Sequence, residues 1–190
     1  SIRDLYNSNK CSFKYALLGD SYVFGEGVNI QDRFDKKIDG TKNFGVNGYS
    51  ILQSYLKFKK YMEKYNCSKK NIILIINSND FKDASTKHRV LRFRPFISIE
   101  NNLIYPNSFI HKIHGFFRDK SYFYYLSALV LSKNFNSDKT IDNMGLENEM
   151  KYILKDNKYI SLKIILHRLN EDQFKKFLSN SLICKDIKCV

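Results

Sequence analysis

The chain has 190 residues, which is enough for one packed domain. Hydrophobic residues make up 43% of it, including 15 Phe and 13 Tyr, and this composition excludes a disordered chain. The 32 Lys and Arg residues against 19 Asp and Glu give a net charge of +13, which would attract phosphates, anionic glycans or anionic membrane surfaces. A general compositional bias toward Lys, Asn, Ile and Tyr is the preferred explanation of this charge. The lysines are scattered over several segments and no nucleic-acid-binding motif is present, so nucleic acid is not an expected partner.

Short apolar strands and an amphipathic helix alternate along the first half of the chain. Residues 15–18 form an apolar run that stops at a Gly-Asp-Ser turn, and residues 42–46 form a second short strand. In residues 51–65, apolar side chains recur at steps of three and four, which predicts a helix. Residues 71–76 (NIILII) are apolar on both faces, as expected of an inner parallel strand.

The second half begins with an unusual segment. Residues 81–106 contain both prolines, several arginines and only a weak strand at 96–99, so we expect an insertion or lid there. Arg92 and Arg94 in this segment are candidate contacts for an anionic substrate, with packing of a long loop as the alternative. The elements expected after it are helices at 122–131, 144–157 and 172–180, a strand at 162–166 and the start of another at 187–190. This alternation predicts a single α/β domain over 1–190, a three-layer α/β/α sandwich with a central parallel sheet.

Three polar motifs follow the first three strands. They are Gly19-Asp20-Ser21, the run Asn43 to Gly48, and Asn77-Ser78-Asn79-Asp80. In a parallel sheet, the carboxyl ends of the strands converge on one edge, where ligands bind. A serine at such a turn exposes its hydroxyl as a nucleophile, while the Ser21 N–H, the Gly48 N–H and the Asn79 carboxamide supply three donors for an oxyanion.

These motifs resemble those of a known family. Leu17 to Val28 (LLGDSYVFGEGV) is similar to the first sequence block of SGNH/GDSL hydrolases, in particular the bacterial branch with a GDSxxxGxGV pattern. The run Asn43 to Ser50 resembles the second block and Asn77 to Asp80 the third, with Asn77 in place of the usual glycine. The resemblance covers roughly residues 14 to 106 and implies Ser21 as nucleophile, with Gly48 and Asn79 in the oxyanion hole.

The catalytic base is the part that departs from the family. These hydrolases carry an Asp and a His as DxxH after the last strand, and the sequence contains no DxxH. We therefore expect the chain to stop short of the loop that holds the base. Among the four histidines, His167 is the best substitute because it ends the predicted strand LKIILH; a packed loop histidine is the alternative. His111 and His114 lack a third ligand at a suitable spacing, so no metal is expected.

The remaining sequence features restrict cofactor and compartment only weakly. Four cysteines are too few for a disulfide scaffold and have no CxxC spacing, although Cys184 and Cys189 lie close enough in the chain to leave a disulfide open. No apolar run reaches the ~20 residues that span a bilayer, and no cofactor motif is present. The location stays open between the bacterial cell envelope or periplasm and the cytoplasm.

The expected function is ester hydrolysis or acyl transfer through an acyl-serine intermediate. The resemblance implies an ester or an acetylated glycan or lipid as substrate, so O-acetyl transfer and deacetylation are both included. The alternative is a catalytically inactive module of the same fold that binds an anionic glycan or another polyanion. Neither acyl length nor oligomeric state follows from the residues.

Overall fold

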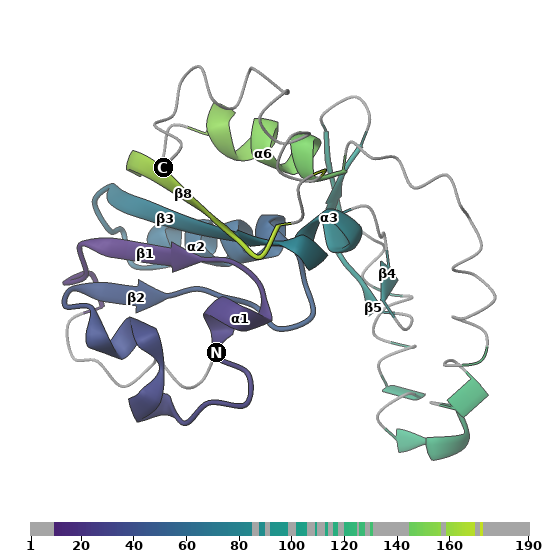
Figure 1. Ribbon diagram of the computed structural model, residues 1–190. Coiled ribbons are helices and arrows are strands. Elements are labelled where there is room, and N and C mark those ends of the chain that lie inside the picture. The colour runs from purple at the N-terminus through teal and green to yellow at the C-terminus, as the bar shows by residue number, and fades with distance from the viewer. Residues whose placement is uncertain are drawn as a thin grey trace.

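The centre of the protein is a parallel four-stranded sheet in the order β2-β1-β3-β8 (Figure 1). The strands are β1 (Tyr15–Leu18), β2 (Thr41–Asn43), β3 (Lys70–Asn77) and β8 (Tyr159–His167). The computed structural model describes residues 10–84, 88–89, 92–98, 102–105, 109, 113, 116–117, 120–124, 126–127, 130, 145–156, 159–169 and 172. The predicted α/β fold with a parallel sheet is therefore confirmed.

One face of the sheet is covered by two helices, α2 (Ile51–Lys64) and α6 (Gly145–Lys155). Ser50 and Gln53 form a capping box that fixes the start of α2. The apolar stripe of α2 then packs on every second residue of β1 and β3, as the alternation of a strand requires. The fully buried members of this core include Ala16, Leu18, Tyr55, Phe58, Ile72, Leu74, Ile76, Met150 and Ile153.

The opposite face carries a smaller apolar cluster. Leu17 and Ile75 pack there against Val23 of α1 (Ser21–Phe24) and Phe34 of η3 (Phe34–Lys37). The 3-10 helix η3 follows a first one, η2 (Ile30–Asp32). Farther along this face, Ile165 of β8 is 46% exposed. The helix expected at 172–180 lies outside the described residues except for residue 172, so the third layer stays a prediction.

A helix that the sequence did not predict follows β3. Residues Ser78–Ala84 form a helix, α3, which lies beyond the carboxyl ends of the strands (Figure 1). Two short antiparallel pairs follow it. They are β4 (His88–Arg89) with β5 (Arg92–Phe93), and β6 (Phe96–Ile97) with β7 (Leu103–Ile104). The weak strand expected at 96–99 is thus present in shorter form as β6. The role of residues 81–106 as a lid stays a prediction.

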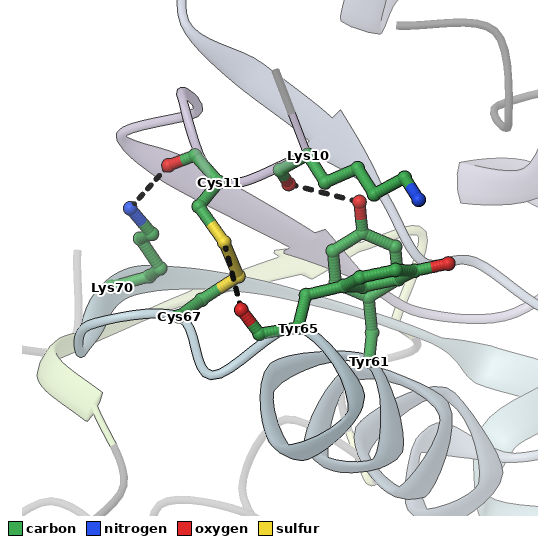
Figure 2. Close-up of a disulfide and its surroundings, with 6 residues drawn as sticks. All are labelled: Lys10, Cys11, Tyr61, Tyr65, Cys67 and Lys70. Carbon is green, nitrogen blue, oxygen red and sulfur yellow. Dashed lines mark hydrogen bonds between the residues drawn. A yellow bond between two sulfur atoms is a disulfide. The ribbon is translucent and has the colours of Figure 1, made fainter. Parts of the chain in front are cut away.

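A disulfide joins Cys11, just before β1, to Cys67, in the turn between α2 and β3 (Figure 2). Their Cα atoms are 5.5 Å apart across 56 residues of sequence. Lys70 Nζ donates to the Cys11 carbonyl at 2.8 Å, and the Tyr61 hydroxyl donates to the Lys10 carbonyl at 2.9 Å, which holds the segment before β1 against α2 and β3. The sequence did not predict this pair, and Cys184 and Cys189 lie outside the described residues.

Among the helices of the described ranges, none combines the length and apolar character required to cross a bilayer.

Candidate active site

Ser21 is the first residue of α1 and follows β1 after a two-residue turn. Gly19 makes this turn possible, since a Cβ at that position would lie 2.8 Å from the Ile75 carbonyl oxygen, and its N–H donates to Ser54 Oγ at 3.0 Å. Asp20 caps the helix, because its carboxylate accepts from the Tyr22 N–H at 3.0 Å. Ser21 is partly exposed in an open cavity of about 370 Å³.

The cavity combines residues from three strand ends. Its lining consists of Asp20, Ser21, Tyr22, Glu26, Asn77, Ser78, Asn79, His167 and Arg168. The first block, the third block and the end of β8 therefore meet at one site, as their positions after parallel strands predicted. Within the described part of the chain, no cluster of three or more His, Cys, Asp or Glu side chains is arranged to hold a metal ion.

Two asparagine side chains of the third block bind the Asp20 carboxylate. Asn77 Nδ2 donates to Asp20 Oδ1 at 2.9 Å, and Asn79 Nδ2 donates to Asp20 Oδ2 at 2.8 Å. The same Asn79 nitrogen donates to Asp83 Oδ2 at 3.2 Å. Asn79 therefore lines the same cavity as Ser21, with its amide nitrogen directed at two carboxylates.

His167 is fixed from two sides. Asn77 and His167 are opposite partners in the β3–β8 register, and His167 Nδ1 lies 2.7 Å from Asn77 Oδ1. The imidazole also stacks on the Tyr22 ring, with centroids 4.5 Å apart and planes at 24°. The structure thus places the histidine that the sequence offered as a substitute base in the same cavity as Ser21.

The second block is held against α1 by a buried polar cluster. Arg33 forms a bidentate ion pair with Asp35, in which Nε donates to Oδ1 at 2.8 Å and Nη2 donates to Oδ2 at 2.7 Å. Asn43 Nδ2 donates to Asp35 and to the Val23 carbonyl, while Asn43 Oδ1 accepts from the Gly45 N–H at 2.8 Å. Burial favours the neutral form of Asp35, but the hydrogen bonds from Arg33 and Asn43 outweigh it and lower the pKa.

Three other predicted site residues lie elsewhere. Gly48 has φ of 76° in the loop after β2 and does not belong to the cavity lining, so its oxyanion role stays a prediction. Arg94 is 2% exposed and does not belong to the cavity lining, so its role as a substrate contact stays a prediction. Arg92 lies in β5, but its side chain is outside the described part.

Buried carboxyl groups lie under the second and third blocks. Glu149 of α6 is bonded to the start of α2 through Ser50 Oγ at 2.6 Å and the Leu52 N–H at 3.2 Å. Burial raises the pKa of Glu149 to about 7, although the Ser50 hydrogen bond and the Arg94 charge oppose this rise. Burial likewise raises the pKa of Asp80 well above its ordinary value, and the Asn77 N–H compensates only in part.

Comparison with protein-family models, curated proteins and solved structures finds no match to this chain. Sequence reasoning missed Tyr22 as a ring partner of His167 and gave Asn77 no role. Tyr22 and Asn77 adjoin predicted site residues in sequence, but no local pattern indicates that both would contact a histidine 90 positions beyond Asn77.

Proposed function

We propose that this domain is a serine ester hydrolase or acyl transferase of the SGNH type. The observation that carries the proposal is the meeting of Ser21, Asn79 and His167 around one open cavity at the carboxyl edge of a parallel sheet. The Ser21 hydroxyl has no hydrogen-bond partner among the described residues, as suits a side chain that acts on a ligand.

The chemistry begins with attack of Ser21 Oγ on the acyl carbonyl carbon. The carbonyl oxygen becomes an oxyanion, which the Ser21 N–H and the Asn79 carboxamide would stabilise, with Gly48 as the third donor that the resemblance implies. Asn79 has two N–H bonds, and one of them is directed at Asp83. Because Asp83 is partly exposed, an oxyanion can replace it as the acceptor of that N–H.

The substrate class follows from the resemblance and agrees with two structural observations. An open cavity of about 370 Å³ accommodates a small acyl group with part of its alcohol. The Cys11–Cys67 disulfide is typical of proteins in oxidising compartments, which supports a place at the cell envelope or periplasm. An O-acetylated glycan or lipid is therefore the proposed substrate.

The test is turnover of p-nitrophenyl acetate, together with mass spectrometry of the acylated protein. We expect Ser21→Ala to abolish both acylation and turnover, and Asn79→Ala to lower kcat by about 10²–10³-fold, as for loss of one oxyanion donor. Asp83→Ala serves as the matched control, since it removes a competing acceptor and leaves the donor in place. Turnover that is equal in the parent and Ser21→Ala would refute the proposal.

A second candidate is a non-catalytic module that binds an anionic glycan. A separate cavity of about 560 Å³ along the outer face of α2 favours it, because lysines and tyrosines line much of its wall. The lysines are Lys57, Lys59 and Lys60, and the tyrosines are Tyr49, Tyr105 and Tyr152. Binding of polygalacturonate that weakens in Lys60→Ala but is unchanged in Ser21→Ala would support this function, provided that esterase activity is absent.

A further inference from the structure

The two points at which this chain departs from the SGNH pattern meet in space. Asn77 stands where the third block usually has glycine, and His167 is a histidine outside any DxxH. They are register partners on β3 and β8, and their side chains are hydrogen bonded at 2.7 Å. A glycine at position 77 has no side chain that could bind the imidazole.

The surrounding bonds determine the orientation of the Asn77 amide. The Asp20 carboxylate, when ionised, can only accept hydrogen bonds, so the Asn77 amide nitrogen must face it at 2.9 Å. The amide oxygen then faces His167, and an amide oxygen can only accept. His167 Nδ1 must therefore carry a proton, and in the neutral ring Nε2 has the free lone pair.

We propose that His167 is the general base of Ser21 and that Asn77 is its positioning residue, which selects the tautomer with the proton on Nδ1. This inference rests on the proposed function. Tyr22, which follows Ser21 directly, stacks on the imidazole and restrains the plane of the ring. An asparagine that orients a catalytic histidine has a precedent in Cys-His-Asn proteases, so an amide is chemically sufficient for the task.

The reaction balances with these groups alone and water. As Ser21 Oγ bonds to the acyl carbon, its proton passes to Nε2 and the carbonyl π electrons move to the oxygen. When the tetrahedral intermediate collapses, the bond to the leaving alkoxide breaks, and Nε2 gives that alkoxide its proton. A water molecule, deprotonated by Nε2, then adds to the acyl carbon of the acyl-serine. When this second intermediate collapses, the bond between the acyl carbon and Ser21 Oγ breaks, the carboxylic acid leaves, and Nε2 returns its proton to Oγ.

The experiment compares the full chain with three variants, His167→Gln, Asn77→Ala and Asn71→Ala. Asn71 is the matched control because it lies at the other end of β3 and also binds a β8 side chain, Ser161, at 2.8 Å. We expect His167→Gln to lower kcat/KM by about 10³-fold or more and Asn77→Ala to lower kcat by about 10²-fold with KM nearly unchanged. Asn71→Ala should leave both constants near those of the parent.

A spectroscopic readout tests the positioning role separately from activity. Nitrogen–proton NMR correlation of His167 should show the proton on Nδ1 in the parent and a shift toward the Nε2-protonated tautomer in Asn77→Ala, but not in Asn71→Ala. A parent imidazole protonated on Nε2 would overturn the inference even if a variant failed to fold. Ser21-dependent turnover that survives in His167→Gln would also overturn it while the proposed function stands. Absence of any Ser21-dependent acylation would instead refute the proposed function.

Discussion

Glu149 provides a pH-dependent test of how the second block is supported. Its carboxyl group is fully buried and contacts Ser50 Oγ at 2.6 Å, while the same hydroxyl lies 2.8 Å from Gln53 Oε1. Ser50 has one hydroxyl proton and cannot donate it to both oxygens. A protonated Glu149 resolves this conflict, because it donates to Ser50 Oγ and leaves the Ser50 proton for Gln53.

The magnitude follows from the pKa in the folded and unfolded chain. A pKa of about 7 in the folded protein against 4.5 in the unfolded chain corresponds to about 3 kcal/mol of stability, at 1.36 kcal/mol for each pH unit. Because the folded pKa is the higher one, the folded state binds the proton more tightly. This contribution is complete below pH 4.5 and is lost as the pH rises through about 7.

The assay is urea unfolding of the parent and Glu149→Gln at about pH 5 and about pH 8. We expect the free energy of unfolding of the parent to fall by about 3 kcal/mol more than that of the variant over this interval. Glu147→Gln is the control on the same helix, since Glu147 pairs with Lys151 at the partly exposed face. Equal pH dependence in the parent and Glu149→Gln would refute the reasoning, because Asp80 and every other titrating group are common to both proteins.

Two further predictions concern stability. Replacing Cys11 and Cys67 together by serine should lower the free energy of unfolding by about 4 kcal/mol, because the bridge closes a loop across 56 residues; equal urea midpoints with and without reductant would contradict this. Gly45→Ala should destabilise the protein by about 1–3 kcal/mol, since its Cβ would lie 2.8 Å from the Val23 backbone carbon, which cannot move aside as a side chain can. Thermal unfolding of Gly45→Ala beside the parent measures this cost, and an unchanged midpoint would contradict crowding at position 45.

The sequence predicted the parts of the fold that depend on local pattern. The strand at β3 and the helices α2 and α6 follow from apolar runs and three- and four-residue periodicity, and their bounds differ from the expected ranges by one or two residues. The helix α3 was missed because its seven residues are too few to show that periodicity. The burial of Arg94 was not predicted, since composition alone does not reveal that this side chain lies close enough to the buried Glu149 to influence its pKa.

The candidate site shows the same division between local and distant information. Ser21 and Asn79 were singled out because each belongs to a short motif at the end of its own strand, and parallel pairing then brings both residues to the wall of one cavity. The contact between Asn77 and His167 spans 90 residues and depends on the β3–β8 register. A shift of that register by one residue would turn His167 to the other face of the sheet. The proposed base therefore depends on the pairing of two strands, and a search for DxxH could not have found it.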